Sequence, residues 1–191
     1  MALTALDPRS ALVVIDLQNG IVAMPTAAPV APIVQRAAAL AEAFRRHRLP
    51  VVLVNVAGIA PGRTEQSRRL GELPPGWTDL VPELNRQPTD HVVTKHSWGA
   101  FTATDLDGYL KAQGVTQLVI AGVSTSIGVE TTARQAYELG FNVTLAIDAM
   151  TDTNSDAHAN SVGRIFPRLG ETGSIAQIIA LLDGTPSAAA S

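Results

Sequence analysis

The alternation of short apolar runs with segments of helical periodicity most constrains the fold of this sequence. Runs that are apolar at nearly every position are typical of strands buried on both faces of a sheet. We expect such strands at residues 11–17, 51–57, 91–95, 117–123 and 142–149, with a short sixth strand at 171–173. Between the runs, apolar residues recur at helical spacing, as they do from 33 to 44. This alternation predicts a parallel sheet with helices on both faces.

Length and composition set the domain organisation and exclude several kinds of chemistry. The chain has 191 residues, a formal net charge of −3 and no cysteine. We expect one domain over residues 1–183 and a disordered tail over 184–191. Without cysteine there are no disulfides, thiolate metal sites or thiol catalysis. Nothing in the charge points to nucleic acid or a membrane surface as a partner, and without a leader or a long apolar run we expect a cytoplasmic protein.

Polar residues at the ends of the predicted strands are the candidates for function. Ligands of open parallel sheets bind beyond the carboxyl ends of the strands. The polar residues at these ends are Asp16, Asn55, Lys95, the turn from Ser124 to Gly128, and Asp148. Asp16 and Lys95 are suited to form an ion pair that supports acid–base chemistry. A structural carboxylate and a solvated lysine remain open alternatives, and Asp148 is interpreted as a structural cap or turn residue.

Common cofactor motifs are absent from the sequence. The stretch from Gly122 to Gly128 lacks the Lys-Ser/Thr ending of a phosphate loop, and Ser126 stands where a nucleophile elbow needs glycine. There is no G-x-G-x-x-G dinucleotide motif. The four histidines show no metal-ligand spacing, and only His96, beside Lys95, is expected near a substrate. We therefore expect neither a metal nor a cofactor.

Four stretches carry a resemblance to a known family. They are VVIDLQNGIV, PPGWTDLVPEL, VVTKHSWGAFTATDLDGYL and LVIAGVSTSIGVETTARQAYELGFNVTLAIDAMTD. Their order and spacing resemble the isochorismatase-like hydrolase superfamily, also called the cysteine hydrolases, over residues 8–182. The resemblance implies a three-layer α/β/α sandwich around a six-stranded parallel sheet in the order 3-2-1-4-5-6. It also implies a cis peptide bond between Val123 and Ser124, and a homodimer or higher homo-oligomer.

The resemblance also implies roles for individual residues. The family's catalytic aspartate and lysine fall on Asp16 and Lys95, whereas its cysteine falls on Gly128. True isochorismatases are similar in carrying glycine there, and their vinyl ether substrate needs no covalent intermediate. The implied general acid is Asp16, with Lys95 as its electrostatic partner, and the substrate is a small anionic metabolite. The Asp-x-His metal motif of nicotinamidases has no counterpart. The expected substrate-binding residues are Gln18, Trp98, Phe101, Val123, Ser124, Thr125, Ile127 and Arg63, with Arg68 and Arg69 as further candidates.

Two other functions remain open at this point. One is amide hydrolysis by a hydroxyl of Ser124, Thr125 or Ser126, although no sequence pattern places a histidine to activate it. The other is a relative that binds a ligand or a partner without catalysis.

Overall fold

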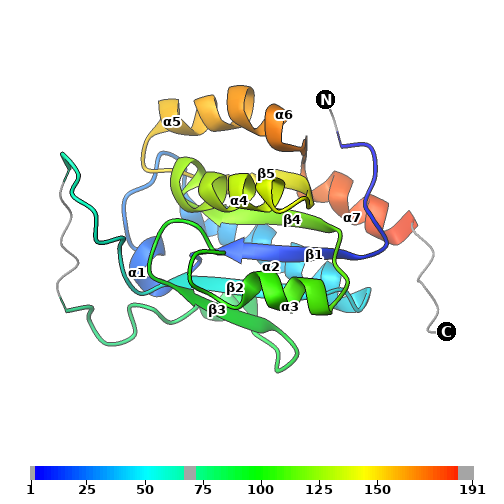
Figure 1. Cartoon of the computed structure of the whole chain (residues 1–191), viewed down its shortest axis with the longest axis horizontal. Helices are drawn as coiled ribbons and strands as arrows, with labels where there is room; N and C mark the ends of the chain where they lie inside the picture. The colour runs from blue at the N-terminus through cyan, green and yellow to red at the C-terminus, as the bar shows by residue number, and fades with distance from the viewer. Residues whose placement is uncertain (1–2, 67–71, 185–191) are drawn as a thin grey trace.

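A twisted parallel sheet forms the centre of the computed structural model, which describes residues 3–66 and 72–184 (Figure 1). Within these residues the sheet has six strands in the order β3-β2-β1-β4-β5-β6. The strands are β1 (Ser10–Ile15), β2 (Val51–Val56), β3 (His91–Lys95), β4 (Gln117–Val123), β5 (Asn142–Thr151) and β6 (Glu171–Gly173). All neighbouring strands pair in parallel. The predicted fold class and strand order are confirmed.

Helices cover both faces of the sheet and give the fold its three layers (Figure 1). On one face, α2 (Val30–Arg46) and α7 (Ile175–Gly184) pack with β1 side chains such as Leu12 and Val14. On the other face, α3 (Leu106–Ala112), α4 (Glu130–Glu138) and α6 (Phe166–Leu169) pack with Val13 and Ile15. Successive β1 residues therefore enter opposite cores, as the two-residue period of a strand requires. This explains why the strand is apolar at every position after Ser10.

Shorter elements complete the described chain. They are α1 (Asn19–Val22), α5 (Ser155–Asn160), a 3₁₀ turn (Pro82–Leu84) and two π-helical turns (Thr125–Val129 and Ser161–Ile165). Between β5 and β6 the chain forms three consecutive helical pieces, which are α5, the second π-helical turn and α6. Of the expected tail over 184–191, Gly184 is the last residue of α7, and residues 185–191 lie outside the described residues. Among the residues described, none of the helices has the length and apolar character needed to cross a membrane.

Strand β5 runs past the point at which the sequence predicted its end. Along β4 the register advances two residues, from Ile120 to Gly122, while the paired residues of β5 advance five, from Leu145 to Met150. The additional residues of β5 form a bulge. Asp148 therefore lies inside β5, and the first residue after the end of the strand is Asp152. The cap interpretation of Asp148 is confirmed, because its Oδ1 accepts from the amide of Ile175 at 2.8 Å, at the start of α7.

Candidate active site

Asp16 and Lys95 meet at the carboxyl edge of the sheet, as the strand ends predicted. Lys95 is the last residue of β3, and Asp16 directly follows β1. The Nζ atom of Lys95 lies 2.8 Å from Oδ2 of Asp16, and it also donates to the carbonyl of Ser97 at 3.1 Å. Only 2% of the lysine side chain and 8% of the aspartate side chain are exposed. The pair is therefore a buried, hydrogen-bonded ion pair.

The backbone of Asp16 turns sharply to direct its side chain into this site. Its φ is 53°, in the left-handed region that few residues other than glycine adopt. Its amide still donates to the carbonyl of Val54 on β2 at 2.9 Å. The chain therefore turns directly after the last hydrogen bond between β1 and β2. Aspartate tolerates this conformation better than most residues, and such strain is concentrated at functional sites.

Burial shifts the ionisation of Asp16. Desolvation raises the pKa of its carboxyl from 3.8 to about 6, although the charge and hydrogen bond of Lys95 act in the opposite direction. Among the described residues, none lies within hydrogen-bonding reach of the buried Oδ1 atom. One carboxyl oxygen is thus held by Lys95, and the other has the character expected of an atom that exchanges a proton with a ligand.

Gly128 lies directly beside this carboxyl. A Cβ atom at position 128 would stand 3.2 Å from Oδ2 of Asp16 and 2.9 Å from Cγ2 of Ile15. The three positions that the resemblance assigned to catalysis therefore converge, and a side chain at 128 would press on both Ile15 and the acid. The glycine at position 122 is required for a different reason. Its φ is +121°, and a Cβ there would collide with the carbonyl of Ile15 on β1.

The turn after β4 is tightly bonded. The Val123–Ser124 peptide bond is cis, as the resemblance implied. The amides of Ile127 and Val129 donate to the carbonyl of Ser124, at 3.2 and 3.1 Å. The amide of Ser126 donates to Oδ2 of Asp152 at 2.7 Å. These three amides are already satisfied within the protein, so they are not donors for a ligand.

Sequence reasoning missed two residues that contact this turn. Asp152 follows β5 and has 1% of its surface exposed. His158 on α5 places Nδ1 2.8 Å from Oγ1 of Thr125, which is fully buried. His96, the histidine expected near a substrate, is exposed and packs against Gly58. The only sequence signal for Asp152 was its place after a β-rich stretch. No pattern in the sequence indicated that His158 lies beside this turn.

The predicted substrate-binding residues lie in different settings. The amide group of Gln18 is occupied by backbone: Nε2 donates to Val56 and Trp77, and Oε1 accepts from Val56. The ring of Phe101 stacks on Phe141, which precedes β5 at the opposite edge of the sheet. Their roles in binding stay predictions.

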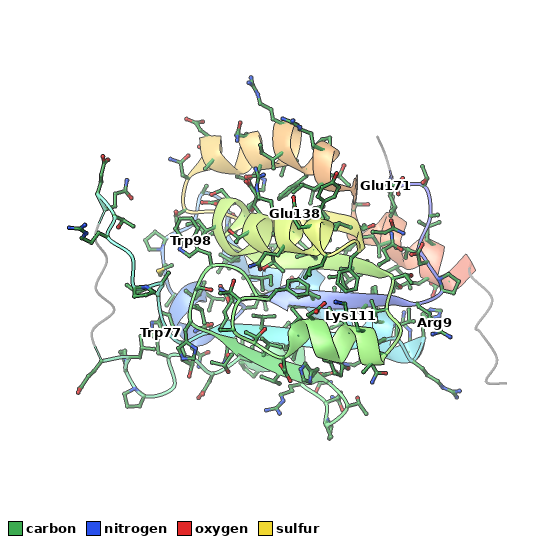
Figure 2. All side chains as sticks on the ribbon, in the orientation of Figure 1. Arg9, Trp77, Trp98, Lys111, Glu138 and Glu171 are labelled. Carbon is green, nitrogen blue, oxygen red and sulfur yellow. The ribbon has the colours of Figure 1, made fainter. Side chains whose placement is uncertain are left out.

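Two further candidates are open to solvent, and three line the turn. Trp98 is 59% exposed, and Figure 2 shows it with Trp77 at the end of the molecule toward which β1 points. Arg63 is exposed on the long loop after β2, whereas Arg68 and Arg69 lie outside the described residues. Val123 is buried, and Ser124 and Ile127 are partly exposed beside Thr125.

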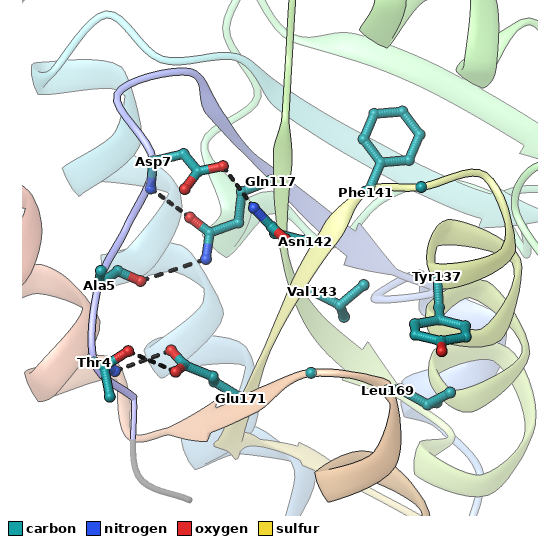
Figure 3. A pocket seen from close by; sticks show the side chains of 12 residues that line it. Thr4, Ala5, Asp7, Gln117, Tyr137, Phe141, Asn142, Val143, Leu169 and Glu171 are labelled. Atoms are coloured by element: carbon teal, nitrogen blue, oxygen red, sulfur yellow. Dashed lines mark hydrogen bonds between the residues drawn. The ribbon is translucent and has the colours of Figure 1, made fainter.

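A separate pocket lies at the amino edge of the sheet, away from Asp16 (Figure 3). Its carboxylates are bonded within the protein: Asp7 accepts from Thr116 and Asn142, and Glu171 accepts from Thr4. Figure 3 shows Asp7 turned toward Asn142, and Glu171 turned toward Thr4. Among the described residues, no group of three or more His, Cys, Asp or Glu side chains is arranged to hold a metal ion.

Comparison with known proteins agrees with this fold. An isochorismatase domain matches residues 10–177. The chain is 39% identical over 171 residues to the uncharacterized isochorismatase family protein YwoC of Bacillus subtilis (strain 168), covering 86% of this chain and 89% of that protein. It is 33% identical over 165 residues to Nicotinamidase 3 of Arabidopsis thaliana, covering 80% and 79%. The structure of an isochorismatase family protein from Burkholderia thailandensis matches with a TM-score of 0.90 and 42% identity, over 94% of this chain and 98% of that one.

The fold and the site place the protein among the three-layer α/β/α folds that carry a buried aspartate–lysine pair at the carboxyl ends of their strands. The comparisons then fix the family. The chain belongs to the isochorismatase family, whose members are hydrolases. It is a member without cysteine.

Proposed function

We propose that this protein hydrolyses a small anionic vinyl ether by acid–base chemistry, without a covalent enzyme intermediate. The observation that carries the proposal is the Asp16 carboxyl, which is buried, has a pKa raised to about 6 and keeps Oδ1 without a donor among the described residues. A carboxyl with this pKa is still partly protonated near neutral pH. It is therefore suited to act as a general acid.

The proposed reaction needs one proton donor and one water molecule. Asp16 donates its proton to the terminal methylene carbon, the C=C electron pair forms the new C–H bond, and an oxocarbenium ion results. Water adds to that ion and loses a proton to the Asp16 carboxylate. Asp16, again protonated, gives this proton to the ether oxygen of the hemiketal, and the C–O bond to that oxygen breaks. The hydroxyl proton of the hemiketal returns to Asp16, and an alcohol and a ketone result. Lys95, at 2.8 Å, stabilises the carboxylate while it is charged.

The position of Gly128 supports the same chemistry. In a thiol hydrolase the nucleophile at this position attacks the substrate, whereas Gly128 has no side chain, and even a Cβ there would stand 3.2 Å from Oδ2 of Asp16. Protonation of carbon requires that the methylene group approach the acid closely, and a side chain at 128 would stand in the way. Trp98 and Arg63 are proposed to contact the bound metabolite, with the arginine pairing a carboxylate.

A paired substrate screen with one variant tests this function. Vinyl ethers that carry a carboxylate on the vinyl carbon release a 2-oxo acid, which a coupled reductase assay measures directly. We expect turnover of such ethers by the wild type, and a kcat about 10²–10⁴-fold lower for Asp16→Asn. Asp156→Asn, which removes an exposed carboxylate on α5, is the matched control and keeps full activity. An Asp16→Asn variant with wild-type kcat would refute the general-acid role.

Amide hydrolysis by Thr125 is the second candidate, favoured by its contact with His158. A distance of 2.8 Å between Oγ1 and Nδ1 is that of a nucleophile and its base. A relative of this chain is named as a nicotinamidase. However, Thr125 is fully buried, so the turn would have to move before a substrate reached the hydroxyl. Hydrolysis of small amides that Thr125→Val abolishes would favour this candidate, and inactivity toward both substrate classes would favour a non-catalytic relative.

A further inference from the structure

Asp152 is a buried carboxylate that the proposed chemistry does not use. It directly follows β5, at the same edge of the sheet as Asp16, and 1% of its surface is exposed. A buried charge is costly unless hydrogen bonds or an opposite charge offset it. Among the described residues, no basic side chain forms an ion pair with Asp152, so its stabilisation must come from hydrogen bonds.

These hydrogen bonds come from the turn that carries Gly128. Oδ2 of Asp152 accepts from the amide of Ser126 at 2.7 Å and from its hydroxyl at 2.8 Å. Oδ1 accepts from the amide of Asn154 at 3.2 Å. The backbone carbonyl of Asp152 also accepts from Ala27 at 2.7 Å, in the segment between α1 and α2. One residue thus joins the end of β5 to the two segments that follow β4 and β1.

The bond to Ser126 acts where the helix has little support of its own. Ser126 lies in the first turn of the helical segment that starts at Thr125, where amides have no partner within the helix. This turn is π-helical, a geometry that is rare and occurs mostly as single turns at functional sites. A carboxylate at a helix N-terminus also interacts favourably with the helix dipole. Asp152 therefore holds Ser126 from outside the helical segment, as His158 holds Thr125.

We propose that Asp152 is a positioning residue, which holds the turn at Ser126 and thereby sets the separation between Gly128 and the Asp16 carboxyl. Gly128 follows Ser126 by two residues in the same helical turn, so a displacement of one moves the other. A Cβ at 128 would stand 3.2 Å from Oδ2 of Asp16, so a small displacement alters the space in which the substrate meets the acid. The inference rests on the function proposed above.

Asp152→Asn is the first test, because it keeps the side chain's size and removes its charge. The asparagine side chain has only one oxygen, so it cannot accept from Ser126 on one side and from Asn154 on the other. Its NH₂ group would face an N–H donor on one of the two sides. We expect faster amide hydrogen exchange across residues 124–130 and a kcat for vinyl ether hydrolysis lowered about 10²-fold, with a smaller change in KM. The control Asp156→Asn changes neither. Faster exchange with an unchanged kcat would overturn the positioning role.

Ser126→Ala is the second variant, and it keeps the Asp152 charge. It removes the hydroxyl donor of Ser126 and keeps the amide donor. The turn is therefore loosened less than in Asp152→Asn, and the changes in exchange and kcat have the same sign but are smaller. The titration of Asp16, followed by the ¹³C resonance of its carboxyl carbon, reports the pocket without any substrate. A loosened turn admits water, so the pKa of Asp16 falls from about 6 toward its ordinary value in both variants. A fall in Ser126→Ala cannot come from a lost charge.

The two readouts separate this inference from the proposed function. If the wild type hydrolyses none of the substrates offered, the proposed function fails, while exchange and titration still test whether Asp152 controls the surroundings of Asp16. If neither variant changes the exchange of residues 124–130 or the titration of Asp16, the positioning role is refuted whatever the activity. If Asp152→Asn does not fold, Ser126→Ala alone decides.

Discussion

Lys95 places its Nζ atom 2.8 Å from Oδ2 of Asp16, across the intervening strand β2. The contact occupies one oxygen of the carboxyl, while Oδ1 has no donor among the described residues. Burial raises the pKa of Asp16 to about 6 in spite of the neighbouring cation. Lys95 therefore stabilises the ionised form of Asp16, while burial favours its protonated form.

The first prediction concerns the pH dependence of activity. A general acid must be protonated in the free enzyme, so the active fraction falls as pH rises through the pKa of Asp16, about 6. We expect kcat/KM to be flat below this pH and to fall about tenfold for each further pH unit above it. Rate measurements with a vinyl ether across the range in which the protein stays folded check this. A kcat/KM that rises with pH would require Asp16 to act as a base instead.

The second prediction concerns stability. The folded protein holds the Asp16 proton up to a pH of about 6, whereas the unfolded chain releases it near 3.8. Between these values the folded state binds more protons, so the free energy of unfolding decreases as pH rises. The contribution of Asp16 is about 3 kcal/mol, present below the lower pKa and lost above the higher one. The difference in unfolding free energy between wild type and Asp16→Asn, measured by denaturant titration, should follow this curve.

A third prediction tests Lys95. Its charge and hydrogen bond lower the pKa of Asp16, so Lys95→Met should raise that pKa and move the fall in kcat/KM upward by about 1–3 pH units. The maximal kcat should decrease, because the ionised acid loses its partner after proton transfer. Lys111→Met is the control, since Lys111 is an exposed lysine in an ion pair with Asp107 on α3. An unshifted profile would show that the two residues are not electrostatically coupled.

The sequence predicted the strands and the Asp16–Lys95 pair for one physical reason. Strands buried on both faces are apolar throughout, so the polar residue that ends each run stands out, as Asp16 and Lys95 do. The same reasoning assigned the end of β5 to Asp148 because it was the first acid after the run. The β5 bulge opposite Ala121 carries the strand past Asp148 to Asp152. A bulge breaks the strand period and leaves no pattern of its own.

Contacts between distant segments were also beyond the sequence. Thr125 and His158 are 33 residues apart, and they meet because α5 lies over the turn after β4. The π-helical turn has no periodic signature distinct from that of an α-helix over five residues. Gln18 was predicted to bind substrate, but the bonds of its side-chain amide to the backbone of Val56 and Trp77 had no signal in the sequence.

Trp98 is the subject of the fourth prediction. Its side chain is largely solvent-exposed, so Trp98→Ala should change the free energy of unfolding by less than about 0.5 kcal/mol. If it contacts the bound metabolite, KM should rise several-fold while kcat changes little, because the acid itself is untouched. Tyr137→Ala, another exposed aromatic residue on α4, is the control. Equal KM values for the two variants would remove Trp98 from the substrate-binding residues.

The last prediction restores the side chain that the family usually carries. The φ of Gly128 is not in the left-handed region, so the backbone accepts a side chain there. A Cβ would press on Cγ2 of Ile15 at 2.9 Å, and we expect Gly128→Cys to lower the free energy of unfolding by about 1–3 kcal/mol. The new thiol would lie in the first helical turn and near Lys95, and both favour the thiolate. It would also occupy the space beside Asp16, so vinyl ether hydrolysis should fall.

Gly163→Cys is the matched control for this thiol. Gly163 lies in the other π-helical turn and is exposed, and a Cβ added there would meet no described atom within 4 Å. The thiol at 128 should react with iodoacetamide faster than the thiol at 163 at neutral pH, because the former lies in the first turn of its helical segment and near the buried Lys95. Position 163 lies inside a helical segment, beside the exposed Arg164. Slower reaction at 128 in a folded variant would mean that burial and the Asp16 charge outweigh Lys95 there. Gly128 would then mark a place where packing against Ile15 requires glycine, and not the former place of a nucleophile.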